Sequence, residues 1–277
     1  MKFWQTSRRK IALDRPLVMG ILNVTPDSFS DGGEFVSVDA AVAHAEQMIA
    51  DGADIIDVGG ESTRPGGEQV AASKEIQRVI PVIEALVKRF DHPISIDTTK
   101  AEVARRAVVA GAEIINDISG LRWEADLADI AAACGAGLVL MHSRGKFETM
   151  HSLEAVDDIV AEVKKSLHES IKIARGRGVA DRQIVLDVGI GFGKTQKQNL
   201  ELIAKLDNIV DEFKAYPMLI GTSRKSFIKA ILGDVPPSER LSGSLGTAIE
   251  AVAKGAKIVR VHDVSETVAA LRSKRVV

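Results

Sequence analysis

A short recurring motif constrains the fold of this chain more than any other feature. A glycine and an alanine, followed by a short apolar run, occur at Gly52, Gly111, Gly135 and Gly255. Each copy follows a helical pattern, so the glycine is typical of a helix C-cap and the apolar run of a strand that is buried on both faces. With similar runs elsewhere, the pattern predicts eight strands near residues 17, 54, 94, 114, 138, 184, 218 and 258.

Helical segments alternate with these strands. Apolar residues at 3.6-residue spacing predict helices over 40–50, 74–90, 101–110, 127–134, 156–175, 200–213, 242–253 and 264–271. Eight alternations favour a (β/α)₈ barrel, with a doubly wound open sheet as the alternative. No linker or shift in composition divides the 277 residues, so we predict one domain over residues 1–277.

Composition and charge exclude several classes of function. The net charge is −2 and only 4% of the residues are aromatic, which gives no case for nucleic acid or an anionic membrane surface. No stretch approaches the roughly 20 apolar residues of a membrane span, and no apolar run of the secretory type follows the basic N-terminus. We therefore expect a cytoplasmic protein. The single cysteine, Cys134, follows an apolar helical pattern and is predicted to be a buried structural thiol.

Polar residues stand where each predicted strand ends. In a barrel these ends meet at one face, which favours a single site over unrelated structural caps. Any one of them could still be structural: Asp117 and Asp187 could cap turns, Asp57 precedes a glycine pair, and His262 could be a buried histidine. The set comprises Asn23, Asp57, Asp97, Asn116, Asp117, His142, Asp187, Arg260, His262 and the segment 223–226.

The residue types at these ends suggest a heterocycle and an anion as ligands. Asp97 and Asp187 follow buried strands, where a carboxylate needs a partner, and a heterocycle with adjacent N–H donors would supply one. Asn116 can both donate and accept. A metal site built from the carboxylates is an alternative, although the sequence lacks a tight Asp/Glu/His cluster. Near the last two strands, a phosphate group could be bound by Arg260 together with Ser223, Arg224 and His262.

The glycine-rich segment 189–194 also invites a phosphate-loop or dinucleotide interpretation. Its spacing is not that of a phosphate loop, and it follows the sixth strand without an acidic residue for a ribose. We expect its glycines to let the backbone approach a ligand, with Phe192 as an apolar wall.

Several segments together resemble dihydropteroate synthase, and the resemblance runs from about Pro16 to the last helix. They are 20–33, with the polar loop that follows the first strand, and 57–66, 95–98, 115–117, 189–194, 221–226 and 260–263. The resemblance implies a transferase of folate biosynthesis. Such an enzyme joins 4-aminobenzoate to a hydroxymethyl-dihydropterin diphosphate, releases diphosphate and dihydropteroate, and is a target of sulfonamides. Two positions depart from the family pattern: Val188 replaces the usual proline, and Ser143 replaces the commoner methionine.

The resemblance also implies roles for individual residues. The implied pterin pocket comprises Asp97, Asn116, Asp187 and Lys225. The implied diphosphate site comprises Asn23, Arg260 and His262. The implied aminobenzoate site comprises Thr63, Arg64, Phe192 and Ser226. Asn23 would be a weak ligand of Mg²⁺, which would lean on the diphosphate and water. Within these sites, Asp97, Lys225, Arg260 and His262 form the expected catalytic set.

The resemblance further implies a homodimer. The polar loops 24–33 and 61–67 suggest ordered binding, with the pterin first. Two rival interpretations are a methyltetrahydrofolate methyltransferase, which would not need the diphosphate group, and a non-catalytic pterin-binding module.

Overall fold

The computed structural model describes residues 2–25, 37–63, 67, 69–150 and 153–273. Eight parallel strands close into a barrel in the order β10-β3-β4-β5-β6-β7-β8-β9. Pairing of β10 with β3 closes the ring, which confirms the predicted (β/α)₈ barrel and makes the open-sheet alternative wrong. The strands are β3 (Leu17–Asn23), β4 (Ile55–Gly59), β5 (Ile94–Asp97), β6 (Ile114–Asp117), β7 (Gly137–Met141), β8 (Ile184–Asp187), β9 (Met218–Ile220) and β10 (Ile258–Val261). The extent of the domain over residues 1–277 stays a prediction.

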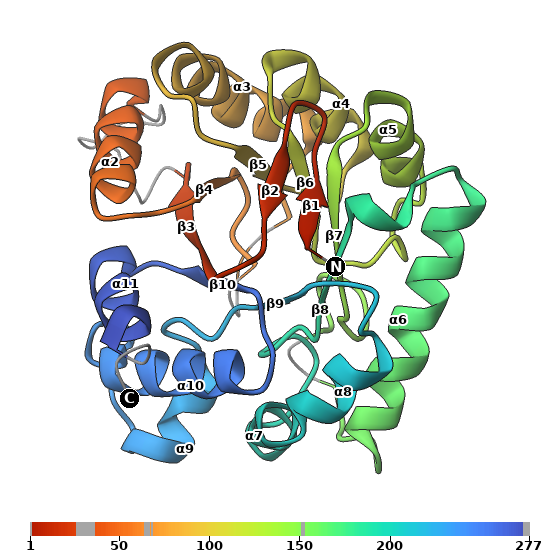
Figure 1. Cartoon of the computed structure of the whole chain (residues 1–277), viewed down its shortest axis with the longest axis vertical. Coiled ribbons are helices and arrows are strands. Elements are labelled where there is room, and N and C mark those ends of the chain that lie inside the picture. The colour runs from red at the N-terminus through yellow and green to blue at the C-terminus, as the bar shows by residue number, and fades with distance from the viewer. Residues whose placement is uncertain (1, 26–36, 64–66, 68, 151–152, 274–277) are drawn as a thin grey trace.

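Helices surround the barrel (Figure 1). They are α2 (Val38–Ala50), α3 (Ala72–Arg89), α4 (Ala101–Ala110), α5 (Asp126–Cys134), α6 (Ile159–Gly176), α7 (Gln196–Ala204), α8 (Leu206–Glu212), α9 (Lys229–Leu232), α10 (Leu241–Ala253) and α11 (Val264–Ser273). Short 3₁₀ turns lie at η1 (Asp181–Gln183), η2 (Ser226–Ile228) and η3 (Pro237–Glu239).

The helix predicted over 200–213 is instead two helices. Thr195 and Gln198 form a capping box that starts α7 earlier than the apolar spacing indicated. Lys205 then leaves the regular helical region, with φ −108° and ψ 19°, and separates α7 from α8. The apolar periodicity continued through this break, so spacing alone could not locate it.

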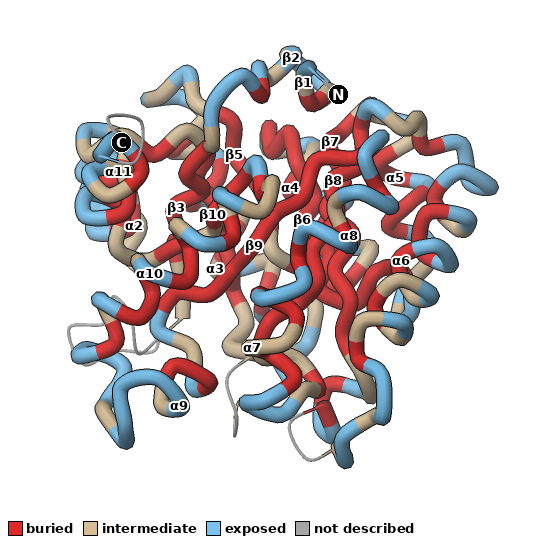
Figure 2. Tube along the Cα trace, turned by 60° about the horizontal axis from the view of Figure 1, so that its bottom comes forward, coloured by how far each residue is buried: buried red, intermediate tan, exposed pale blue. Residues whose placement is uncertain are grey.

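Two apolar cores hold the barrel together. The larger core lies between the strands and the surrounding helices, so the strand residues are buried on both faces (Figure 2). The smaller core contains side chains from the strands and from the N-terminal segment, with no helix residue, and it therefore fills the barrel interior. Its largest member is Trp4, which is fully buried.

An N-terminal hairpin, which the sequence patterns did not predict, covers one end of the barrel (Figure 1). Strands β1 (Phe3–Gln5) and β2 (Lys10–Ala12) pair antiparallel. Trp4 Nε1 donates to the carbonyl of Gln183, 2.6 Å away, the residue directly before β8. A Cβ at Gly137, the first residue of β7, would lie 2.9 Å from the Trp4 ring, so only glycine fits there. The hairpin thus closes the end at which the strands begin.

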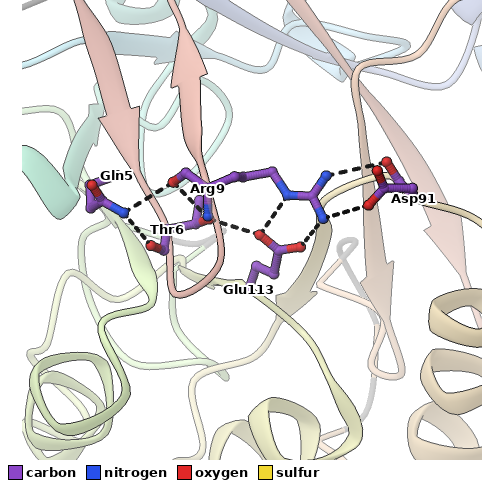
Figure 3. Close-up of polar contacts among 5 residues, drawn as sticks. All are labelled: Gln5, Thr6, Arg9, Asp91 and Glu113. Carbon is purple, nitrogen blue, oxygen red and sulfur yellow. Dashed lines mark hydrogen bonds and ion pairs between the residues drawn. The ribbon is translucent and has the colours of Figure 1, made fainter.

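Ion pairs fasten the hairpin to the barrel (Figure 3). Arg9 Nη2 lies 2.7 Å from Glu113 Oε1 and 3.1 Å from Asp91 Oδ1. Thr6 Oγ1 donates to Glu113 Oε2 at 2.8 Å. Glu113 directly precedes β6, so this contact also lies at the end where the strands begin. A functional site is therefore expected at the opposite end of the barrel, where the strands end.

Two further sequence predictions can be placed on this fold. Cys134 ends α5 and is half-buried rather than fully buried, because it lies at the helix end; its Sγ donates to the carbonyl of Ile130 at 2.9 Å. Burial raises the pKa of this thiol, as expected for a structural cysteine. Among the helices that the structure describes, none is long and apolar enough to cross a membrane.

Candidate active site

The register of the barrel brings the polar strand ends to one level. Asn23 is paired with Gly59, Gly59 with Asp97, and Asp97 with Asn116. These positions end β3, β4, β5 and nearly end β6. The convergence expected from the sequence is therefore present on this side of the barrel.

Arg260, on β10, contacts carboxylates on two other strands, β4 and β5. Its Nε lies 2.6 Å from Asp57 Oδ2, and its Nη2 lies 2.6 Å from Asp97 Oδ2. Asn116 Nδ2 donates to Asp57 Oδ2 at 3.1 Å. Four residues on four strands thus form one hydrogen-bonded group at the mouth of the barrel.

Burial and charge set the protonation of this group. Burial lowers the pKa of Arg260, but Asp57 and Asp97 outweigh that effect and the pKa is raised, so the guanidinium stays charged. Burial raises the pKa of Asp97 to about 7, because the attraction of Arg260 offsets only part of the desolvation. Asp97 therefore changes charge close to neutral pH.

Asp57 has a larger place in the site than the sequence suggested. The glycine pair after it allows a purely structural role, but its fully buried carboxylate contacts both Arg260 and Asn116. It is the one charged residue of the buried strand β4 and lies two residues before its end, and this charge within an apolar run was the signal that could have found it. Asp57 fixes the guanidinium from the β4 side.

Lys225 and Asp187 form a second charged group. Lys225 Nζ donates to the carbonyl of Ile190 at 2.6 Å and lies 4.7 Å from the centroid of the Phe192 ring. Burial lowers the pKa of Lys225 to about 8, although the charge of Asp187 opposes this shift. Burial raises the pKa of Asp187, whose Oδ1 accepts the N–H of Gly189 at 2.7 Å.

Glycines in the segment after β8 let side chains and backbone approach closely. Gly191 has φ +87°, and a Cβ there would lie 3.2 Å from Lys225 Cδ. Gly189 has φ +67°, and a Cβ there would lie 1.8 Å from the carbonyl oxygen of His142. The close approach is therefore to residues of the chain itself, whereas the approach to a ligand stays a prediction.

Lys194 is bound to the backbone of the same segment. Its Nζ donates to the carbonyls of Gly189 and Phe192 at 2.7 and 3.1 Å. This explains why the glycine-rich segment carries a lysine without being a phosphate loop. The neighbouring His142 is almost fully buried, and burial lowers its pKa to about 2, so its imidazole is neutral.

Ser223 and His262 pair across β9 and β10. The Oγ of Ser223 accepts the backbone N–H of His262 and lies 3.1 Å from its Nδ1. If the hydroxyl donates to Nδ1, Nε2 carries the ring proton and becomes a donor for an anion. Arg224, which the sequence predicts to supply a cation for phosphate, forms an ion pair with Asp263, and its role at a phosphate stays a prediction.

The remaining predicted site residues differ in how far they are buried. Asn23 and Thr63 are half-buried, whereas Ser226 is exposed at the start of η2. Arg64 and most of the polar loop after β3 lie outside the described residues. Of the two departures from the family pattern, Val188 is fully buried and Ser143 Oγ accepts a hydrogen bond from Arg122 at 2.7 Å.

The fold and the site, a barrel with carboxylates and cations at its strand ends, define a class of protein. Comparison with known proteins identifies this class. A family model described as pterin binding enzyme matches residues 19–262, so the protein is a pterin-binding barrel enzyme. Dihydropteroate synthase of Escherichia coli strain K12 is 51% identical over 262 residues, which cover 94% of this chain and 91% of that protein.

Solved structures give the same result. Dihydropteroate synthase of Xanthomonas albilineans with 4-aminobenzoic acid has a TM-score of 0.91 and 43% identity, and the match covers 99% of this chain and 98% of that one. The Yersinia pestis enzyme in a sulfonamide drug complex has a TM-score of 0.90 and 42% identity, with 98% of both chains covered. The chain belongs to the dihydropteroate synthase family and, as expected, is a transferase of folate biosynthesis.

Proposed function

We propose that the Arg260 group binds the pterin diphosphate and that the cup around it transfers the pterin methylene to 4-aminobenzoate. The observation that supports this proposal is the contact of one guanidinium with both Asp57 and Asp97 at the barrel mouth. A cation fixed beside two strand-end carboxylates provides both signs of charge that a pterin diphosphate requires. The roles given below to individual residues are part of this proposal.

The pterin ring would lie between Asp97, Asn116, Asp187 and Lys225. Both aspartates end buried strands, and each accepts a hydrogen bond through only one oxygen from the residues that the structure describes. A carboxylate with an oxygen to spare suits the adjacent N–H donors of an aminopyrimidinone. Lys225, whose ammonium lies 4.7 Å from the centroid of the Phe192 ring, would donate to a ring acceptor.

The leaving diphosphate would contact Arg260, His262 and Asn23. Arg260 uses Nε and Nη2 for the carboxylates, and its Nη1 makes no hydrogen bond to the residues that the structure describes. Because the guanidinium is already fixed, it can stabilise the departing charge without reorganising. The Nε2–H of His262 would be a second donor.

The donor set is compatible with a magnesium ion bound chiefly by the substrate. Among the described residues, no three His, Cys, Asp or Glu side chains lie close enough to form a metal site. Asn23, at the end of β3, offers one amide oxygen, which fits an ion that takes most ligands from diphosphate and water. A bound Mg²⁺ would neutralise charge on the leaving diphosphate.

Aminobenzoate would bind beside Thr63, Arg64, Phe192 and Ser226, and the amine would attack the pterin methylene. An aryl amine is neutral at pH 7, so no strong base has to activate it. The protein's contribution is to orient the two substrates and to stabilise the charge that develops on the diphosphate. We also propose that sulfonamides compete at this position, because the Yersinia pestis relative is known in a sulfonamide drug complex.

Incubation of the purified protein with both substrates and Mg²⁺ tests the proposal. We expect dihydropteroate, detected by mass, to form only when pterin diphosphate and aminobenzoate are both present. Pterin binding without product in the full mixture would favour the non-catalytic module. Product formation unaffected by Arg260→Lys would contradict the role given to the Arg260 group.

Homodimer formation and a cytoplasmic location complete the proposal. The homodimer rests on the family resemblance, and light scattering on the purified protein measures it directly. A single species with twice the mass of one chain is expected. The location rests on the composition and N-terminal pattern of the sequence, and fractionation of cells that express the protein tests it.

A further inference from the structure

Three charged side chains lie buried together just outside the site described above. Lys100 Nζ lies 2.8 Å from Glu61 Oε1 and 2.7 Å from Glu75 Oε2. The side chains are 11%, 8% and 0% exposed, respectively. Glu61 follows β4, Glu75 lies in α3, and Lys100 precedes α4, so the cluster connects two neighbouring strand-helix units.

Stability alone gives a poor account of such a cluster. Desolvation of buried charges offsets much of their attraction, and apolar residues of similar volume are often as stable. Burial does raise the pKa of Glu75, which shows that the desolvation is substantial even with Lys100 beside it. A specific geometry that the ion pairs impose is therefore a better explanation than added stability.

The geometry that is imposed concerns both ends of one segment. Glu61 Oε1 also accepts the backbone N–H of Val70 at 2.5 Å, so one carboxylate oxygen binds the far end of segment 61–70 as well as Lys100. Arg78 Nη1 donates to the carbonyl of Gly60 at 2.7 Å and so fixes the residue directly before Glu61. Thr63 lies only two residues after Glu61.

The same cluster is tied to the end of β5. Lys100 lies three residues after Asp97, and its backbone N–H donates to Thr98 Oγ1 at 3.2 Å. Gly59, two residues before Glu61, pairs with Asp97 in the barrel. Lys100 thus joins the segment that carries Thr63 to the strand that carries the pterin carboxylate.

We propose that Glu61 is a positioning residue for aminobenzoate, which acts by holding the two ends of segment 61–70 together against Lys100. The inference rests on the proposed role of Thr63 in aminobenzoate binding. Both contacts of the Glu61 carboxylate are with Lys100 and the backbone of Val70, so we assign it an indirect role and no contact with the substrates. Its loss should impair the second substrate and leave the pterin pocket intact.

Glu61→Ala is the informative variant, because it removes the tie to Val70 but leaves Lys100 paired with Glu75. We expect the KM for aminobenzoate to rise about tenfold or more, with kcat within about threefold and the pterin Kd within about twofold of the wild type. In Glu61→Gln the amide oxygen can still accept from Val70 and Lys100, so its KM should lie between those of Glu61→Ala and the wild type.

Glu84→Ala, an exposed change on α3, is the matched control and should alter none of these constants. A Glu61→Ala KM equal to that of the control would overturn the inference, and so would a pterin Kd that weakens in the same proportion as the KM. If Glu61→Ala does not fold, the same criteria apply to Glu61→Gln. Failure of the proposed function is distinguishable, because the wild-type protein would then form no dihydropteroate.

Discussion

Replacement of Asp97 by asparagine should weaken pterin binding more than a simple loss of charge would. In the structure Asp97 Oδ2 accepts from Arg260, which leaves Oδ1 for the ligand. An asparagine would have to direct its one oxygen to Arg260 and its NH₂ to the N–H donors of the pterin. The variant thus places a donor against a donor, so the site loses a bond and gains an unpaired group.

The magnitude follows from the nature of that bond. A hydrogen bond to a charged group contributes about 1.5–3 kcal/mol, and about 1.4 kcal/mol corresponds to a factor of ten in affinity. We therefore expect the pterin Kd to rise by roughly 10- to 150-fold. The Arg260 contact survives through the amide oxygen, so the protein should remain folded.

The pH dependence of pterin binding provides an independent check. Asp97 accepts two donors only when it is ionised, and its pKa is about 7, so affinity should increase as the pH rises through 7. Burial lowers the pKa of Lys225 to about 8, so affinity should fall again as that ammonium loses its proton. In Asp97→Asn the rise through pH 7 should disappear while the fall near 8 remains.

Calorimetry with a pterin ligand at a series of pH values measures both effects. Asp54→Asn is the control, because Asp54 pairs with Arg15 near the opposite end of the barrel and should not affect binding. An unchanged Kd in Asp97→Asn, or a rise through pH 7 that persists in this variant, would refute the assignment of Asp97 to the pterin pocket.

Five further predictions test the other parts of the proposed function and of the fold. Lys225→Ala should reduce turnover by a factor on the order of 10²–10³ and weaken binding of the pterin ring, whereas Arg260→Ala should lose affinity for pyrophosphate, which calorimetry measures. Near-normal turnover in both variants would show that the leaving-group site lies elsewhere. Arg260→Ala should also lower the free energy of unfolding, by about 3–5 kcal/mol, since it leaves buried carboxylates unpaired. Trp4→Ala should cost about 3–5 kcal/mol in urea unfolding without changing the KM values, and altered KM values would show that the hairpin influences the site. Removal of Mg²⁺ with a chelator should weaken pyrophosphate binding to the wild-type protein, and an unchanged Kd would argue against the metal. Aminobenzoate should bind measurably only with pterin, pyrophosphate and Mg²⁺ present, and equal affinity without them would contradict ordered binding.

The strands of the barrel were predictable because each is buried on two faces. Segments such as Ile94–Asp97 and Ile184–Asp187 are mostly apolar runs that end in an aspartate, and this pattern depends only on local sequence. The hairpin was not predictable, because three-residue strands are too short to show a period. Its key residue, Trp4, is explained only by the space inside the barrel.

The identity of the site residues was more accessible than their partners. A polar residue after an apolar run indicates the barrel mouth, which is why Asp97, Asn116 and Arg260 could be singled out. Their pairing could not be read, because Arg260 and Asp57 are 203 residues apart in the chain. Lys194 illustrates the same limit: its spacing excluded a phosphate loop, but only the structure shows that backbone carbonyls bind its ammonium.

The arrangement of charges explains how one barrel mouth could accommodate a cationic leaving-group site and an anionic ring site side by side. Without Arg260, the carboxylates of Asp57 and Asp97 would lie buried on adjacent strands with no cation between them, which is energetically costly. Without the two aspartates, the guanidinium would have to order itself around each incoming diphosphate. Because Arg260 contacts both carboxylates, its orientation is fixed by the fold, and these contacts also direct its Nη1, which makes no hydrogen bond within the described part of the chain. A change at Asp57 should therefore affect turnover through the orientation of Arg260, even though Asp57 itself is fully buried.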